Sequence, residues 1–217
     1  MKLTIIANGT LNDIEYHKNI IKDSDKIICA DGGANNVKLL DIIPDYVIGD
    51  MDSVDKETLE DLKNNNKTEV IIDSNQNKTD LELAIEIANS LNPTEIILIG
   101  AIGVRIDHTI ANILSLEKLN QKNQDNNLIK IRLIDNKNEI SILDELNNSI
   151  EIDGKKNDIV SIIALADVEG LTYQGLKWEL NNFSAKSGWI GVCNKMISNK
   201  ASVKLISGKI LVIKSKD

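Results

Sequence analysis

Short apolar runs alternate with segments of helical periodicity over the first 134 residues, and this alternation constrains the fold more than any other feature. Several runs, such as 26–30 and 95–100, are almost continuously apolar, which is typical of parallel strands covered on both faces. Between two runs, Thr79 and Glu82 have the spacing of a capping box at the start of a helix. Repeated strand–helix units predict an α/β fold, an open parallel sheet with helices on both faces.

The expected elements of this half follow from the same periodicity. Strands are expected at 3–7, 26–30, 46–49, 69–72, 95–100 and 129–134. Helices are expected near 14–22, 34–41, 55–64, 79–91 and 108–120.

The pattern changes after the polar break at 135–138, where strand-like runs follow one another without helices. We expect these strands at 139–143, 149–152, 158–165, 170–173, 176–180, 201–206 and 210–214. Consecutive short strands predict a small antiparallel sandwich or barrel. We therefore expect two domains, an α/β domain over 1–135 and a β domain over 136–217.

Charge and composition exclude several classes of protein. The chain has 25 basic and 33 acidic residues and a net charge of -8, which argues against general nucleic-acid binding. A bound divalent cation would still allow phosphorylated small molecules to bind. No apolar run reaches the ~20 residues of a membrane span, and the N-terminus does not have the form of a signal peptide. Cys29 and Cys193 lie far apart and lack zinc-ligand spacing, so we expect a cytoplasmic protein without membrane or nucleic-acid partners.

Acidic residues and glycines follow four of the expected strands. The segments are 31–35, 49–53, 73–80 and 100–108. The carboxyl ends of parallel strands lie along one edge of a sheet, where open α/β sheets bind ligands. We therefore expect these segments to converge on one site.

Taken singly, each aspartate has a simpler interpretation as a helix cap or turn residue. Several carboxylates along one edge repel one another strongly unless a cation lies among them. Oxygen ligands without a His/Cys set favour Mg²⁺, and Asp50 and Asp52 have the spacing to bind one ion. Arg105 is suited to phosphate oxygens, so the combination indicates phosphoryl transfer. His108 is a candidate general base or a helix-start residue.

These motifs in this order resemble the thiamine pyrophosphokinase family. The resemblance runs from the segment 31–35 through 44–53, Lys78-Thr79-Asp80 and 100–112 to 175–180 and 191–194, and so spans the chain. It implies a Rossmann-like domain followed by a β-sandwich, and a homodimer. It also implies transfer of the diphosphoryl group of ATP to thiamine with Mg²⁺ as cofactor, giving thiamine diphosphate and AMP.

The resemblance also implies roles for individual residues. Catalytic roles fall to Asp52, Asp80, Arg105 and Asp107. Mg²⁺ would be held and the triphosphate oriented by Asp50, Asp52 and Asp80, together with Asp107. ATP would be bordered by Asp31, Gly32, Gly33, Asn35, Thr79, Arg105, Asp107 and His108. The thiamine site would include Gln76, Trp178, Cys193 and Asn194, in a pocket formed where two subunits meet.

Three positions depart from the family pattern. Val104 replaces a glycine before the arginine, Cys193 replaces a serine, and Asn77 occupies a position that is often acidic. Trp178 also alternates with Leu176 and Leu180, so without the resemblance a place in the sandwich core is the favoured interpretation. Alternative functions are diphosphoryl transfer to another alcohol such as a pterin, nucleotide hydrolysis, and a non-catalytic nucleotide- or thiamine-binding module.

Overall fold

The computed structural model describes residues 1–73, 77–103, 105–119 and 122–216. The chain forms two compact units, Met1–Asn136 and Lys137–Asp217. They are called unit 1 and unit 2 below. Among the described residues, no helix has both the length and the apolar character needed to span a membrane.

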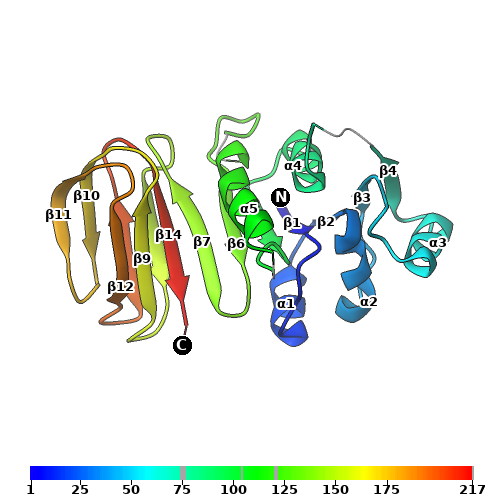
Figure 1. Ribbon diagram of the computed structural model, residues 1–217, viewed down its shortest axis with the longest axis horizontal. Helices are drawn as coiled ribbons and strands as arrows, with labels where there is room; N and C mark the ends of the chain where they lie inside the picture. The colour runs from blue at the N-terminus through cyan, green and yellow to red at the C-terminus, as the bar shows by residue number, and fades with distance from the viewer. Residues whose placement is uncertain (74–76, 104, 120–121, 217) are drawn as a thin grey trace. The chain divides into compact units, whose positions relative to one another are not determined.

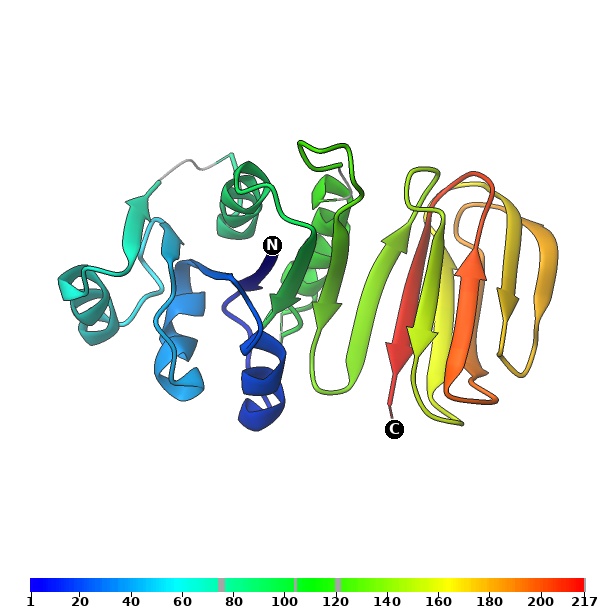
Figure 2. The ribbon, with the colours of Figure 1, turned by 180° about the vertical axis from the view of Figure 1, so that it is seen from behind.

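Unit 1 contains a parallel sheet of six strands in the spatial order β6-β5-β1-β2-β3-β4 (Figures 1 and 2). The strands are β1 (Lys2–Ile6), β2 (Lys26–Ala30), β3 (Tyr46–Gly49), β4 (Glu69–Ile72), β5 (Glu95–Ile99) and β6 (Lys130–Ile134). β1 lies between β2 and β5 in the interior of the sheet, and its residues Leu3, Ile5 and Ile6 are fully buried. The predicted open parallel sheet is confirmed.

Helices cover both faces of this sheet. They are α1 (Ile14–Ile21), the 3-10 helix η1 (Asp31–Asn36), α2 (Val37–Leu40), α3 (Lys56–Asn64), α4 (Asp80–Ser90) and α5 (Ile106–Leu119). Side chains of α1, α2 and α3 form one core cluster with alternate strand residues such as Ile6, Cys29 and Val47. Helix α4 contacts β1, β2 and β3, and α5 contacts β6. Because strand side chains alternate, α4 and α5 cover the face that carries Ile5 and Ile28.

Unit 2 is an antiparallel β-sandwich, as predicted. One sheet has the order β12-β9-β14-β7 and the other β11-β10-β13-β8. The strands are β7 (Asn138–Leu143), β8 (Ser149–Asp153), β9 (Ile159–Ala164), β10 (Val168–Gln174), β11 (Leu180–Ala185), β12 (Ile190–Lys195), β13 (Lys200–Lys204) and β14 (Ile210–Ser215). Inward-facing residues of both sheets, including Val160, Leu171, Val203 and Ile210, form one buried core.

Two expected elements are wrong in detail, and one strand was missed. Residues 176–180 do not form a strand of their own, because only Leu176 pairs there, with Met196, before β11 begins at Leu180. Strand β12 was not expected, because a register shift between Gly191 and Asn194 interrupts its alternation. The expected helix 34–41 starts earlier, as the 3-10 helix η1.

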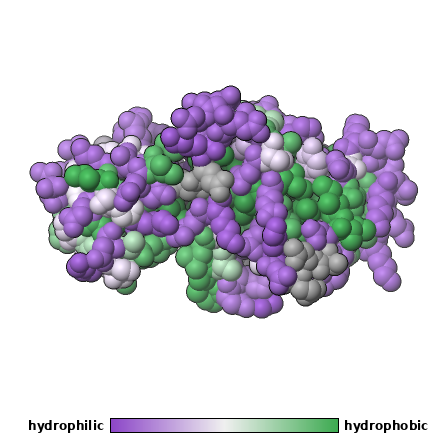
Figure 3. All heavy atoms as spheres, turned by 90° about the horizontal axis from the view of Figure 1, so that it is seen from above, coloured by the Kyte–Doolittle hydropathy of each residue, from purple (hydrophilic) through white to green (hydrophobic). Residues whose placement is uncertain are grey.

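On the face drawn in Figure 3, hydrophilic side chains predominate, with hydrophobic patches between them. In unit 2 the exposed large apolar side chains include Trp178, Ile190, Val192 and Ile197. Ile190 and Val192 both belong to β12, which pairs with β9 and is the terminal strand of its sheet in the described part of the chain. An exposed apolar edge strand of this kind is available for contact with another chain.

Candidate active site

Three carboxylates lie together at the carboxyl ends of β2 and β3. One oxygen each of Asp31, Asp50 and Asp52 lies within 4.8 Å of the others. Asp31 follows β2 directly and begins η1, while Asp50 follows β3 directly. The convergence expected from the strand order is therefore observed, because parallel strands bring both loops to the same edge.

The loop after β3 turns its two aspartates away from the core. Met51 has a positive φ of 67° and is only 9% exposed, with its side chain in the core cluster of unit 1. Its neighbours Asp50 and Asp52 are exposed. The Asp52 N–H donates to Asp50 Oδ1 (3.1 Å), which tightens the turn between them. A buried residue between two exposed carboxylates thus anchors the loop.

Asp80, the first residue of α4, belongs to the same group. A Cβ placed on Gly49 would lie 2.8 Å from Asp80 Oδ1 and 2.8 Å from Asp31 Cβ, so both residues pack against this glycine. Burial raises the pKa of Asp80, and the negative charges of Asp31, Asp50 and Asp52 raise it further. Asp80 therefore lies within the electrostatic field of the other three carboxylates.

These carboxylates fit a hard divalent cation. Asp31 is only 5% exposed, and its Oδ1 is buried with no hydrogen-bond partner among the residues that the structure describes. A buried unpartnered carboxylate oxygen beside two further carboxylates is unfavourable in the absence of a cation. Mg²⁺ prefers such oxygen ligands. The group includes Asp31, which the resemblance assigned to ATP and not to the metal.

A cavity of about 680 Å³ opens beside the carboxylates. Its lining includes Asp31, Ser53, Thr79, Asp80, Arg105, Asp107, His108 and Asn112, together with glycines of the loops after β1 and β5. The N-terminal ends of α4 and α5 both reach this cavity, so exposed backbone N–H groups accompany the charged side chains. The arrangement suits a polyphosphate.

Arg105 and Asp107 form a two-point ion pair at the edge of the cavity. Arg105 Nε lies 3.2 Å from Asp107 Oδ1, and Nη2 lies 2.6 Å from Oδ2. The hydrogen bonds from Arg105 lower the pKa of Asp107 to about 2. Asp107 thus pairs with the guanidinium, and it is not among the carboxylates that converge on Asp31. His108 lines the cavity in the first turn of α5.

Both glycines after Asp31 are needed for close packing with the β1 region. A Cβ on Gly33 would lie 2.1 Å from the Ile6 carbonyl oxygen, and one on Gly32 would lie 2.3 Å from the Asn8 side chain. The lining of the cavity does not include either glycine. Their lack of side chains lets η1 approach β1 closely, which sets the position of Asp31.

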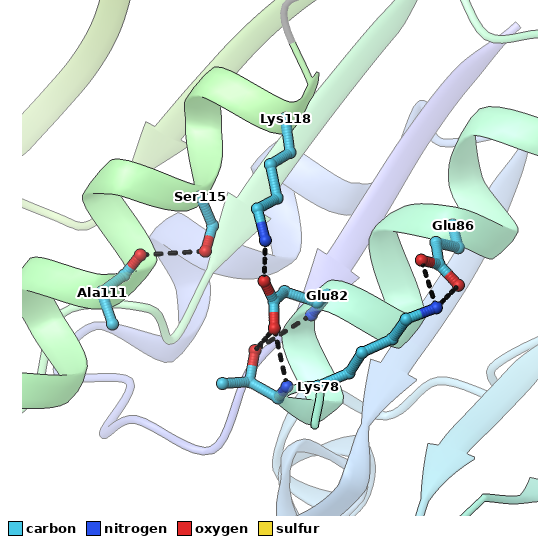
Figure 4. Close-up of polar contacts among 7 residues, drawn as sticks. Lys78, Glu82, Glu86, Ala111, Ser115 and Lys118 are labelled. Carbon is cyan, nitrogen blue, oxygen red and sulfur yellow. Dashed lines mark hydrogen bonds and ion pairs between the residues drawn. The ribbon is translucent and has the colours of Figure 1, made fainter. Parts of the chain in front are cut away.

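A polar network links α4 to α5 (Figure 4). Thr79 and Glu82 form the expected capping box: the Thr79 N–H donates to Glu82 Oε2 (2.8 Å), and the Glu82 N–H donates to Thr79 Oγ1 (3.2 Å). Lys118 of α5 pairs with the other oxygen of Glu82. The Thr79 hydroxyl therefore stabilises the first turn of α4, the turn that carries Asp80.

Three cavity residues were missed from the sequence. Asn8, Gly9 and Thr10 follow β1 and line the cavity. Their place after the central strand is the signal that points to them, but they carry no charge and match no motif. Two expected positions, Gln76 and Val104, lie outside the described residues.

Three of the residues expected to contact thiamine, Trp178, Cys193 and Asn194, lie in unit 2. Trp178 is 56% exposed, so it is not part of the sandwich core, and Lys177 Nζ lies 4.6 Å from its ring centroid. Asn194 is buried and fixes the Trp178 backbone, accepting from its N–H (3.1 Å) and donating to its carbonyl (2.7 Å). Cys193 is exposed at a positive φ of 62°. Asn194 thus positions Trp178.

The fold and the cavity define a class of protein, an α/β phosphotransferase whose clustered carboxylates lie at the carboxyl edge of a parallel sheet. Comparison with known proteins gives the family. Residues 17–129 match the model of the thiamin pyrophosphokinase catalytic domain, and residues 147–210 match that of the thiamin pyrophosphokinase vitamin B1 binding domain.

Individual relatives agree with these matches. A thiamine pyrophosphokinase of Bacillus subtilis is 31% identical over 218 residues, covering 99% of both chains. A rice protein, thiamine pyrophosphokinase 1, is 27% identical over 211 residues, covering 85% of this chain and 76% of its own. The crystal structure of the enzyme from Bacillus subtilis superposes with a TM-score of 0.85 at 27% identity, over the whole of both chains. The chain therefore belongs to the thiamine pyrophosphokinase family, as its motifs indicated, and this family forms thiamine diphosphate from ATP.

Proposed function

We propose that this chain transfers the diphosphoryl group of ATP to the hydroxyl of thiamine, giving thiamine diphosphate and AMP, and that ATP and Mg²⁺ bind in the cavity of unit 1. The observation that carries the proposal is the grouping of Asp31, Asp50 and Asp52 beside a cavity that Arg105 also lines. Membership of the family supports the same reaction.

The polyphosphate is held from two sides. Arg105 supplies a planar guanidinium for phosphate oxygens, and the first turns of α4 and α5 supply backbone N–H groups. Asp107 orients Arg105 through the two-point pair. His108, in the same turn of α5, borders the nucleotide.

Asp31, Asp50 and Asp52 would hold Mg²⁺, with Asp80 beside them. When bound, the ion offsets the charge of the phosphates and of the carboxylates together. Asp50 and Asp52 face solvent, so a ligand can reach them without a change in the loop.

The chemical step is an in-line displacement at the β-phosphorus. The thiamine hydroxyl oxygen forms the new bond, and the bond between the β-phosphorus and the oxygen bridging to the α-phosphate breaks, so that AMP leaves with that oxygen. A nearby carboxylate accepts the hydroxyl proton. Arg105 stabilises the charge that develops on the phosphates.

Thiamine recognition is assigned to unit 2. Trp178 offers an exposed aromatic face for a flat, cationic ring, and Asn194 holds its backbone in place. Cys193 lies beside Asn194, and Gln76 completes the proposed set. The pocket would form in a homodimer, which the exposed apolar residues Ile190 and Val192 of β12 support.

We place the enzyme in the cytoplasm. Both cysteines have free thiols, Cys29 buried and Cys193 exposed, which suits a reducing compartment. The substrates are small molecules, and the net charge of -8 supports the absence of a nucleic-acid partner.

The test is AMP formation from ATP and Mg²⁺, measured with and without thiamine. We expect AMP and thiamine diphosphate in equal amounts, and only when thiamine is present. AMP formation without an acceptor would indicate a hydrolase, and AMP formation with a pterin alcohol in place of thiamine would indicate a different diphosphokinase. No AMP under any of these conditions would indicate a binding module.

A further inference from the structure

Asn35 contacts both ends of the segment 53–55, which directly follows Asp50 and Asp52 in the loop after β3. Its Nδ2 donates to the Ser53 carbonyl oxygen (2.9 Å), and its Oδ1 accepts from the Asp55 N–H (2.9 Å). The amide thus makes one bond as a donor and one as an acceptor, which an aspartate or an alanine cannot reproduce together. Asn35 lies in η1, the helix that Asp31 begins.

The contact joins the two elements that supply the carboxylates. Asp31 comes from η1, whereas Asp50 and Asp52 come from the loop after β3. Val54, between the two backbone groups that Asn35 binds, is buried in the same core cluster as Met51. The loop is therefore fixed to the core by Met51 and Val54, and to η1 by the amide of Asn35.

We infer that Asn35 is a positioning residue that holds Asp50 and Asp52 at the correct distance from Asp31, and so sets the affinity of the site for a divalent cation. Asn35 does not line the cavity, so this role differs from the direct contact with ATP that the sequence motif implied. Residues that orient metal ligands through hydrogen bonds typically change metal affinity by about 10- to 100-fold when they are replaced. This inference rests on the metal site of the proposed function.

The experiment measures Mn²⁺ binding by electron paramagnetic resonance, without nucleotide, in the wild type and in Asn35→Ala. We expect affinity in Asn35→Ala to fall by about 10- to 100-fold. Hydrogen exchange at the Asp55 amide should become faster, and a high Mg²⁺ concentration should restore much of the lost activity. ATP binding in the presence of EDTA should not change. The matched control is Asn66→Ala, an exposed asparagine after α3, which should bind Mn²⁺ like the wild type.

Asn35→Asp separates position from charge. This variant keeps an acceptor for the Asp55 N–H but loses the donor to Ser53, and it adds a negative charge near the cation. A positioning role predicts weaker Mn²⁺ binding despite the added charge, whereas a purely electrostatic role predicts tighter binding and would overturn the inference. The same variant tests the inference if Asn35→Ala does not fold.

Other results would also overturn it. Unchanged Mn²⁺ affinity in Asn35→Ala would do so, as would weaker ATP binding in EDTA, which would indicate direct contact with the nucleotide. Asp52→Asn, measured in parallel, tests the metal site itself. If the wild type and Asp52→Asn bind Mn²⁺ equally, the proposed metal site fails, and the role of Asn35 fails with it.

Discussion

The acidic side chains after β2 and β3 lie close enough to repel one another. Two carboxylates ~4 Å apart repel by about 4 kcal/mol at an effective dielectric constant of about 20. The oxygens of Asp31, Asp50 and Asp52 lie within 4.8 Å of one another, so the group gains most from a shared cation. If no cation bound there, these three carboxylates would only lower the stability of the fold.

Replacing Asp52 by Asn should therefore reduce catalysis and not folding. We expect kcat to fall by about 10²- to 10³-fold, because a group that organises transition-state charge is removed. The measurement is the rate of AMP formation at saturating ATP and thiamine, with circular dichroism as a check on folding. Asp23→Asn, at an exposed position in the loop after α1, is the control and should retain full activity. Normal turnover in Asp52→Asn would remove this residue from the mechanism.

Replacing Asp80 by Asn should raise the stability of the metal-free protein. The folded-state pKa of Asp80 is raised, so its contribution to stability is fully present below the unfolded pKa of about 3.9 and is lost as pH rises through the folded pKa. At pH 7 and without metal, Asp80→Asn should raise the melting temperature by ~1–3 °C. The advantage should shrink on acidification, which thermal melts in EDTA between pH 4 and pH 7 would detect. A lower melting temperature for the variant at pH 7 would contradict the proposed repulsion.

At the scale of secondary structure, η1 depends on a glycine that has room for no side chain. A Cβ on Gly33 would lie 2.1 Å from a backbone oxygen of β1, and neither backbone can move without disturbing the sheet. Gly33→Ala should lower the free energy of unfolding by about 3 kcal/mol or more. Gly188→Ala is the matched control, because its φ is +83° but nothing lies within 4 Å of the added Cβ. It should cost only ~1 kcal/mol from backbone strain. Urea denaturation of both variants provides the comparison, and equal losses would contradict the packing argument.

The elements also show how far the sequence could predict this molecule. Apolar runs predicted β2, β3 and β4 with the observed bounds. The residues of β2 and β3 are mostly buried, as such runs indicate, whereas β4 is an edge strand with exposed and half-buried residues. Strand β12 was missed because the irregularity near Cys193, which has a positive φ, interrupts the alternation. Local patterning does not show such irregularities.

Charged residues of the site that follow a parallel strand could be predicted from the sequence. Asp50, Asp52 and Asp80 were expected to converge because each lies in a segment that follows the carboxyl end of a parallel strand. The contacts of Asn35 with Ser53 and Asp55 were not predictable, since they depend on side-chain directions across two loops. Asn8 and Thr10 line the cavity without any charge that would mark them in the sequence.

At the scale of the whole molecule, the proposed homodimer depends on the apolar side chains of β12. Val192 is 52% exposed and Ile190 is 62% exposed on this edge strand. A charge placed there should prevent a second copy from packing on it. We expect the wild type to sediment at twice the chain mass of 24.0 kDa, and Val192→Glu at the mass of a single chain. Lys156→Glu, an exposed change on the turn before β9, is the control and should remain dimeric. A monomeric wild type would contradict the dimer.

The most direct test of the metal site is a crystal structure of the chain soaked with Mn²⁺ and a non-hydrolysable ATP analogue, with anomalous scattering used to locate the ion. We predict an anomalous peak within bonding distance of the carboxylates of Asp50 and Asp52, with Asp31 beside it and a phosphate oxygen as a further ligand. A peak elsewhere in the molecule, or an analogue bound away from these carboxylates, would contradict the account.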